Sequence, residues 1–382
     1  MYVTLMEQVD QRAVAQAGWV AWQRGDVATA RALFEDVAAA GVPNPDLWLL
    51  LAQARIATGA EDLVDQALDR VLALDPRNIG ALILKGDRAP DDRAATSYYQ
   101  LAVAQAQRTP AKDPASAALI RQAQDKLARI SERFAAHLRA TLAAHPAGAR
   151  FDEALALVLG EKQIYFQSPT SFFFPGLPHR QFFEAGEFAW AADLMAATDA
   201  ITAELRALLD AGSGLAPYVR ADPTRANRGH ALLDDPRWSA FHLIENGAPV
   251  PHAETRFPHT MDALARVPMP VIAARSPMAL FSVLQPDTHI PPHSGMLNTR
   301  LICHLPLIVP PDCSLRVGND IRPVERGKLM IFDDSIEHEA WNRSDATRVV
   351  LLFEIWRPEL SADERAALTT LFEAVGLYAG GQ

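Results

Sequence analysis

Two histidines in the last third of the chain have the residue type and the spacing to hold a metal ion. His293 and His338 lie 45 residues apart, and each stands at the edge of a segment that reads as a β-strand. Imidazole nitrogens ligate iron, zinc, copper and nickel. Non-haem iron(II) sites usually add a carboxylate, but the residue two positions after His293 is Gly295. The pattern therefore indicates either a metal site that lacks one protein ligand or no metal site at all.

Arg348 is a candidate for binding an anion. It stands ten residues after His338, at the start of the apolar segment VVLLFEIW. A guanidinium is costly to bury unless it meets a negative charge. Two interpretations fit equally well: the arginine binds an anionic ligand, or it is a core arginine paired with an aspartate or glutamate of the chain.

Short segments rich in β-forming residues surround these positions. Proline, glycine, asparagine and aspartate separate them, which is typical of an all-β sandwich or barrel such as a jelly roll. The sequence IPPH, residues 290–293, predicts a proline-stiffened turn. A helical stretch at 190–212 precedes the strands, and a last helix is expected from Ser361, where Glu364 completes a capping box. The expected strands are 279–285, 300–309, 314–319, 328–334, 337–342 and 347–356.

The N-terminal part of the chain is alanine-rich and has the apolar spacing of helices. Two of its segments align with Gly25 on Gly59, a period of 34 residues, and Pro76 closes the second segment. A third, degenerate unit begins at Asn78, and a longer helix follows it. The period resembles that of tetratricopeptide repeats, in which helix pairs stack side by side. A generic helical bundle is the alternative.

Four motifs follow one another in the C-terminal half: H-x-G-x-x-N-x-R-L-x-x-H-L at 293–305, CSLRVGN at 313–319, GKLMIFDDSIEHEAWN at 327–342, and R-x-x-x-x-F-E-I-W-x-P-E-L at 348–360. This set closely resembles the aspartyl/asparaginyl β-hydroxylase family, and weaker matches, FPGLP and WSAFHLIENG, lie upstream. The resemblance implies a double-stranded β-helix (jelly-roll or cupin-like) oxygenase domain over residues 160–382, behind helical repeats over residues 1–150. The expected fold class is α+β.

The resemblance also implies which residues hold the metal. Members of the family bind iron(II) through two histidines and leave the carboxylate position vacant, with a glycine two residues after the first histidine. His293 and His338 are the implied ligands, and Gly295 is then the expected residue. Water can fill the vacant position, because 2-oxoglutarate supplies two further oxygen ligands.

Roles for the neighbouring residues follow from the same resemblance. Arg348 and Ser282 would bind the distal carboxylate of 2-oxoglutarate, and His304 would contact its other end, near the metal. Arg300 would face the substrate and pair with an acidic side chain or a main-chain carboxylate. Relatives often carry a second arginine two residues later, where this chain has Ile302. This departure weakens the expectation of selectivity for an aspartyl peptide.

The implied activity is that of an iron(II)- and 2-oxoglutarate-dependent dioxygenase that uses O₂ to hydroxylate the β-carbon of an aspartyl or asparaginyl residue. The substrate would be a peptide or protein, which the concave face of the repeats could hold. Three alternatives remain: a hydroxylase of a non-peptide substrate (a lipid acyl chain or a small molecule), a halogenase with chloride in the vacant position, and an inactive repeat-based adaptor.

Composition limits the environment and the partners. The net charge of −10 argues against binding to nucleic acid or to an anionic membrane, since both need basic surface. The only cysteines, Cys303 and Cys313, exclude a disulfide framework and fit a cytoplasmic location. The N-terminus lacks the pattern of a signal peptide. The longest apolar runs fall short of the roughly 20 residues that span a bilayer, so stable membrane insertion is not expected.

Overall fold

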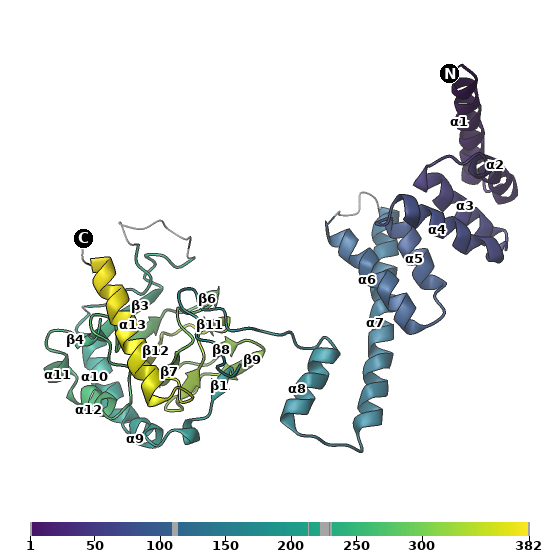
Figure 1. Ribbon diagram of the computed structural model, residues 1–382. Coiled ribbons are helices and arrows are strands. Elements are labelled where there is room, and N and C mark those ends of the chain that lie inside the picture. Colours follow the sequence, from purple (N-terminus) through teal and green to yellow (C-terminus); the bar gives the residue numbers. More distant parts are fainter. Residues whose placement is uncertain (1, 109–113, 213, 222–228, 230, 381–382) are drawn as a thin grey trace. The chain divides into compact units, whose positions relative to one another are not determined.

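The computed structural model describes residues 2–108, 114–212, 214–221, 229 and 231–380 (Figure 1). The chain divides into two compact units, Met1–Leu159 and Gly160–Gln382. The described residues of the first unit form helices and their connections, and the second unit contains two sheets with flanking helices. The α+β fold class is therefore confirmed.

The first unit is built from consecutive helix pairs. The strongest helix contacts join α1 to α2, α3 to α4, and α5 to α6, as expected for stacked two-helix repeats. The helices are α1 (Tyr2–Gln23), α2 (Val27–Ala39), α3 (Pro45–Ala57), α4 (Val64–Leu74), α5 (Ile79–Asp87), α6 (Asp92–Arg108), α7 (Pro114–Leu142) and α8 (Ala149–Val158).

The 34-residue period has a structural counterpart at two kinds of position. Gly25 and Gly59 each follow the first helix of a pair and have φ values of +79° and +71°, a conformation that glycine adopts without steric cost. Asn44 and Asn78, also 34 residues apart, are the N-caps of α3 and α5, and their side chains accept hydrogen bonds from backbone N–H groups of the first turn. The repeating turn and cap residues confirm the tetratricopeptide-like repeats.

The second unit contains two antiparallel sheets. The larger has the strand order β1-β10-β7-β12-β5-β3-β2, with β4 paired to β3, and the smaller has the order β6-β11-β8-β9. The strands are β1 (Phe182–Phe183), β2 (Ala216–Pro217), β3 (Trp238–Glu245), β4 (Ala248–Pro249), β5 (Ala279–Leu284), β6 (Thr288–His293), β7 (Arg300–Ile308), β8 (Cys313–Val317), β9 (Asp320–Pro323), β10 (Met330–Phe332), β11 (His338–Asn342) and β12 (Arg348–Trp356).

The larger sheet is apolar on both faces, which explains why its central strands read as continuous apolar runs. One face packs against the helices α9 (Ala191–Ala196), α10 (Thr198–Asp210) and α12 (Pro258–Ala265). The opposite face packs against the smaller sheet, and this shared interior contains Ile302, Leu315 and Leu352. The two sheets thus form the predicted double-layered β-domain.

The remaining helices of the second unit are α11 (Ala253–Arg256) and α13 (Ala362–Gly380). The predicted capping box is present before α13, because the Glu364 N–H donates to Ser361 Oγ over 3.2 Å and the Ser361 N–H donates to the Glu364 carboxylate over 2.8 Å. The helical stretch predicted at 190–212 is two short helices, α9 and α10.

One local prediction was wrong. Residues 290–293 were expected to form a turn, but they belong to strand β6, which pairs with β11. Proline has no N–H to donate, so it fits only where a strand has an unpaired edge. Since β6 is the edge strand of the smaller sheet, Pro291 and Pro292 are tolerated there.

Candidate functional site

The pairing of β6 with β11 brings the two candidate metal ligands together. His293 lies directly opposite His338 in the strand register, and the ring centroids are 4.1 Å apart. The Nδ1 atoms contact the carbonyl oxygens of Pro291 and Ile336, at 2.8 Å and 3.0 Å. A carbonyl oxygen only accepts, so each Nδ1 carries the proton. In the neutral form of each ring the lone pair is then on Nε2, the form in which histidine binds metals.

Burial keeps the His338 imidazole neutral. Desolvation, with a smaller contribution from the neighbouring His293, lowers the pKa of His338 to about 3. His304 lies on β7 close to this pair, and burial likewise lowers its pKa well below the ordinary value, with Arg348 and His338 acting in the same direction. A divalent cation therefore meets no bound proton to displace from His338 at neutral pH.

Arg348 is a buried cation. The residue is 1% exposed, and its Nε and Nη1 atoms have no hydrogen-bond partner within the part of the chain that the structure describes. Burial lowers its pKa to about 10, so the guanidinium remains charged at pH 7. Among the described residues no carboxylate forms an ion pair with it. The core-arginine interpretation needs such a carboxylate, so the geometry favours an anion site.

All six candidate site residues line one cavity of about 510 Å³ inside the β-domain. The strand register explains their convergence: Arg348 pairs with Leu284, Val350 with Ser282, and Leu352 with His304, so these alternate positions face the same side of the larger sheet. Trp238 on β3 donates from Nε1 to Ser282 Oγ over 3.1 Å. The six residues are Ser282, His293, Arg300, His304, His338 and Arg348.

The side chain of Asp334 leaves no room for a side chain at Gly295. A Cβ atom added at Gly295 would lie 1.9 Å from Asp334 Oδ2. The backbones of the two residues are also hydrogen-bonded, since the Gly295 N–H donates to the Asp334 carbonyl over 2.6 Å. Burial raises the pKa of the Asp334 carboxyl to about 6, although Arg300 acts in the opposite direction. The carboxylate of Asp334, which is far from Gly295 in the sequence, thus lies beside this glycine in the structure.

We expect Gly295→Ala to destabilise the β-domain by about 1–3 kcal/mol, because Asp334 must move away and leave a buried ion pair incomplete. Gly186→Ala is the matched control, since nothing lies within 4 Å of a Cβ at that position. Chemical denaturation of both variants measures the difference. Equal stabilities would show that Asp334 is not held as described.

Arg300 is already paired within the protein. Its guanidinium donates to the carboxylate of Glu354 and, over 3.3 Å, to Asp334 Oδ2. Glu354 is 1% exposed, so one of these partners is deep in the core. Two carboxylates of the chain thus pair with Arg300, while its Nε has no hydrogen-bond partner among the described residues, so its role toward a substrate stays a prediction.

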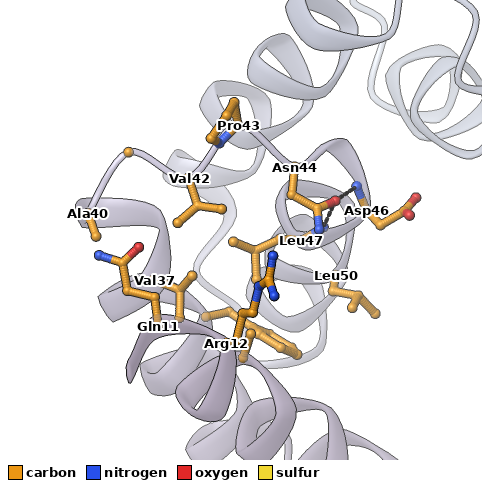
Figure 2. A pocket seen from close by; sticks show the side chains of 13 residues that line it. Gln11, Arg12, Val37, Ala40, Val42, Pro43, Asn44, Asp46, Leu47 and Leu50 are labelled. Atoms are coloured by element: carbon orange, nitrogen blue, oxygen red, sulfur yellow. Dashed lines mark hydrogen bonds between the residues drawn. The ribbon is translucent and has the colours of Figure 1, made fainter. Parts of the chain in front are cut away.

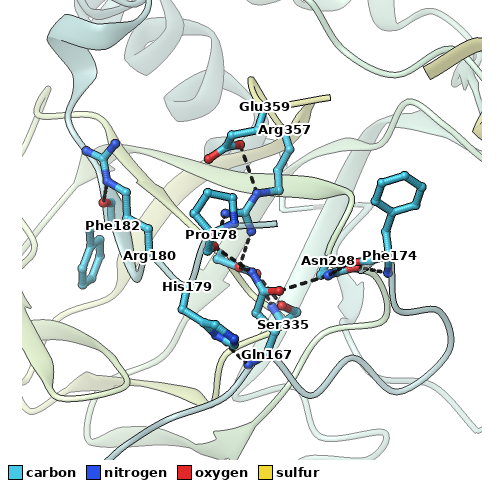
Figure 3. A network of polar contacts seen from close by, with 11 residues as sticks. Gln167, Phe174, Pro178, His179, Arg180, Phe182, Asn298, Ser335, Arg357 and Glu359 are labelled. Carbon is cyan, nitrogen blue, oxygen red and sulfur yellow. Dashed lines mark hydrogen bonds and ion pairs between the residues drawn. The ribbon is translucent and has the colours of Figure 1, made fainter. Parts of the chain in front are cut away.

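A buried polar network fixes the chain segment at 167–178 (Figure 3), of which Thr170 lines the cavity. Arg357 and Asp333 form an ion pair in which both side chains are fully buried. Gln167 donates to Asp333 over 2.7 Å, and Asn298 donates to Gln167 over 3.0 Å. The Thr170 N–H in turn donates to the Gly295 carbonyl over 2.9 Å. Sequence reasoning did not identify this network, although Arg357 directly after an apolar strand was a signal for it.

A second hollow, of about 650 Å³, lies in the first unit (Figure 2). Side chains of α1, α2 and α3 line it, among them Arg12, Val37 and Leu50, together with the loop at 40–44. Its lining is mixed, and it contains no cluster of metal-binding residues. Among the described residues of the whole chain, no group of three or more His, Cys, Asp or Glu side chains could hold a metal ion.

Comparison with known proteins identifies the relatives of the β-domain. Residues 195–358 match the family described as aspartyl/asparaginyl beta-hydroxylase. The human aspartyl/asparaginyl beta-hydroxylase is 33% identical over 159 residues, which cover 41% of this chain and 21% of that protein. The ornithine lipid ester-linked acyl 2-hydroxylase of Rhizobium tropici is 35% identical over 179 residues, 46% of this chain and 60% of that protein.

The matched region therefore spans only part of each relative, about a fifth of the human protein and 60% of the rhizobial one. Among solved structures, the Sgt2 TPR domain from Aspergillus fumigatus aligns with a TM-score of 0.27 and 16% identity, over 37% of this chain and 87% of that domain. Within the described residues, no helix combines the length and the apolar character needed to cross a membrane.

Proposed function

Residues 195–358 match the aspartyl/asparaginyl β-hydroxylase family. From this match we propose that the chain is an iron(II)- and 2-oxoglutarate-dependent hydroxylase. The observation that carries the proposal is the placement of Arg348. Two donors of this buried cation have no partner among the described residues, and the cation lies in the same cavity as two facing histidines. Two histidines that could bind one metal ion and an arginine that could bind an anion lie in one cavity. This arrangement suits a ligand that chelates the metal at one end and carries a carboxylate at the other.

The residues present fit both groups. His293 and His338 would hold iron(II) through Nε2, because their Nδ1 atoms are occupied by carbonyl oxygens. Arg348 and Ser282 would hold the distal carboxylate of 2-oxoglutarate, and His304 would contact its metal-proximal end. When bound, iron(II) with 2-oxoglutarate supplies the oxidation in which one atom of O₂ becomes a substrate hydroxyl group and the other enters succinate, with release of CO₂.

The chain itself positions the metal-binding side chains and excludes water from the cavity. The inner faces of the two sheets exclude bulk water around His338 and Arg348, which are 9% and 1% exposed. Exclusion of water strengthens each charge–charge contact in the cavity. The carbonyls of Pro291 and Ile336 fix the ring orientations, so the metal ligands need little rearrangement.

Two substrate classes remain candidates. One is the β-carbon of an aspartyl or asparaginyl residue in a peptide or protein, which the name of the human relative supports. The repeats would then hold the polypeptide, and the hollow of Figure 2 offers a place for it. The other is an acyl chain, which the name of the rhizobial relative and the apolar side chains of the cavity support.

We expect Arg348→Met to weaken 2-oxoglutarate binding about a hundredfold while iron(II) binding is retained, because a buried partner of the carboxylate is lost. Ser282→Ala should weaken it about fivefold, the value of one hydrogen bond. Calorimetric titration of the iron-loaded variants measures both. Parallel loss of iron in Arg348→Met would contradict the assignment of Arg348 to the cosubstrate.

The proposal is tested by following succinate formation from 2-oxoglutarate in air, with iron(II) and without added substrate. Slow, iron-dependent turnover that disappears in Arg348→Met is the expected result. If the protein binds 2-oxoglutarate no better than that variant and forms no succinate, the chain is not a hydroxylase of this class. An inactive adaptor would then be the better explanation.

A further inference from the structure

The last helix, α13, packs on the β-domain along one face. Figure 1 shows it in yellow on the surface of that domain. Leu368 and Phe372 are 3% and 4% exposed, and they pack with Ile272, Leu297 and Leu360. These two side chains lie one helical turn apart, so they define a single side of the helix. The other sides of α13 are therefore left to solvent or to a partner.

A second side of α13 carries an apolar stripe, which consists of Ala367, Leu371, Ala374 and Tyr378. Leu371 is 42% exposed and Tyr378 is 88% exposed, and both alanines are exposed as well. The four residues follow one another at spacings of four, three and four, which is the spacing of the seam between two packed helices. At 3.6 residues per turn, the stripe lies about 110° around the helix from the buried face. It is therefore not part of the surface that holds α13 on the domain.

The stripe has almost no charge beside it. Between Ala366 and Tyr378 the only charged residue is Glu373. Its carboxylate accepts a hydrogen bond from the Ala273 N–H over 3.1 Å, so it is turned toward the domain. A solvated helix normally carries charges on its exposed side, as α7 does with Arg121, Asp125, Arg129, Glu132 and Arg133. The uncharged stripe of α13 instead has the composition of a packing surface, and two copies of it would bring no like charges together.

The order of large and small residues along the stripe fits a second copy of the same stripe. In an antiparallel pair whose two-fold axis passes between Leu371 and Ala374, Leu371 of each copy faces Ala374 of the other, and Tyr378 faces Ala367. Each large side chain then meets an alanine, so the helices can approach closely. A parallel pair would set large residues against large ones and alanines against alanines, which leaves gaps. The stripe is thus self-complementary, as a two-fold interface requires.

The area of the stripe is sufficient for a reversible dimer. Burial of a tyrosine removes about 150–250 Å² from water, and Tyr378 is 88% exposed. Val375 flanks the stripe and is 51% exposed. With this valine, each copy offers on the order of 500 Å² of apolar surface. Two copies would bury about 1,000 Å², the lower end for a specific interface, so we expect a dissociation constant on the order of 10 µM.

We propose that α13 is a dimerisation helix, and that its apolar stripe pairs in antiparallel order with the same stripe of a second copy of this chain. The inference is independent of the hydroxylase function, because no residue of α13 is among those that line the cavity. Its test is therefore the mass of the protein in solution, not the formation of succinate.

The first experiment is analytical ultracentrifugation of the full chain at concentrations from about 1 to 100 µM, the range around the expected dissociation constant. The wild type should pass from monomer to dimer. Ala374→Glu should raise the dissociation constant at least about tenfold, because it places a charge at the centre of an apolar contact. Ala366→Glu is the matched control: Ala366 is an exposed alanine of the same helix that lies about 110° from the stripe, so this variant should dimerise like the wild type.

Three results would contradict the proposal: a wild type that stays monomeric over this range, a dimer that Ala374→Glu leaves intact, or an equal effect of the two glutamates. The first would leave the stripe to another occupant. If the monomeric wild type floats with phosphatidylcholine vesicles and Ala374→Glu does not, the stripe binds a lipid surface instead of a second copy.

Two variants that each add one cysteine test the antiparallel order without adding a charge. Positions 367 and 378 face each other across the pair, so a mixture of Ala367→Cys and Tyr378→Cys should form a disulfide-linked dimer on oxidation. Neither variant should do so alone, because its own cysteines would lie about 16 Å apart along the helices. The native Cys303 and Cys313 are buried and should not interfere. Cross-linking of each variant alone, or none in the mixture, would rule out the antiparallel pair.

Discussion

Replacement of His338 by alanine is expected to abolish stable iron(II) binding and to leave the β-domain folded. The site offers two imidazoles on paired strands, so removal of one leaves a single protein ligand. The substitution leaves a small apolar residue on β11. The pairing of β11 with its neighbouring strands depends on backbone hydrogen bonds, so it does not need the His338 side chain. Anaerobic loading followed by gel filtration and metal analysis measures iron per chain, and circular dichroism reports the fold.

His289→Ala is the matched control for this prediction. His289 also lies on β6, but its ring contacts Glu339 at 2.7 Å and stacks on Trp341. It does not line the cavity. The control should therefore retain iron. If His338→Ala retains one iron per chain, or if His289→Ala loses it equally, the metal is held somewhere other than between His293 and His338.

Replacement of Arg357 by leucine is expected to destabilise the β-domain by about 3–5 kcal/mol, the cost of leaving a buried charge unpaired. Asp333 and Arg357 are both fully buried, and the network around Asp333 would lose its only described cation. The segment at 167–178 should loosen with it, because Arg357 also donates to the Pro178 carbonyl over 2.7 Å. Urea denaturation followed by tryptophan fluorescence measures the change.

A surface ion pair provides the comparison. Arg266 and Asp262 lie four residues apart on and just after α12, with side chains 60% and 67% exposed. Arg266→Leu should cost less than about 1 kcal/mol, since water solvates both groups. The double replacement Arg357→Leu with Asp333→Asn should recover part of the stability, because the unpaired charge is removed. A loss in Arg357→Leu no larger than in Arg266→Leu would show that the network does not stabilise the domain.

Local sequence patterns were sufficient for most of the fold. The 34-residue period placed Gly25 and Gly59 in equivalent turns, and Asn78 was correctly taken as the start of a third unit. Alternating and continuous apolar runs located the strands around His338 and Arg348. These features depend on residues near one another in the chain, which is why a single sequence reveals them.

The parts that sequence reasoning missed depend on long-range register. Arg300 meets Glu354 only because β7 lies beside β12, and these residues are 54 positions apart. The approach of Asp334 to Gly295 likewise needs the turns after β6 and β10 to meet. The edge position of β6, which permits its two prolines, is a property of the finished sheet. No local propensity carries that information.

We propose that His293, His338 and Arg348 together form one site for iron(II) and 2-oxoglutarate. Anaerobic titration of the iron-loaded protein with 2-oxoglutarate tests it most directly, through the visible charge-transfer band of the chelate. We expect a band that saturates at one equivalent, requires far more 2-oxoglutarate in Arg348→Met, and is absent in His338→Ala. A wild-type protein that takes up no iron, or takes up iron and develops no band with 2-oxoglutarate, would contradict it.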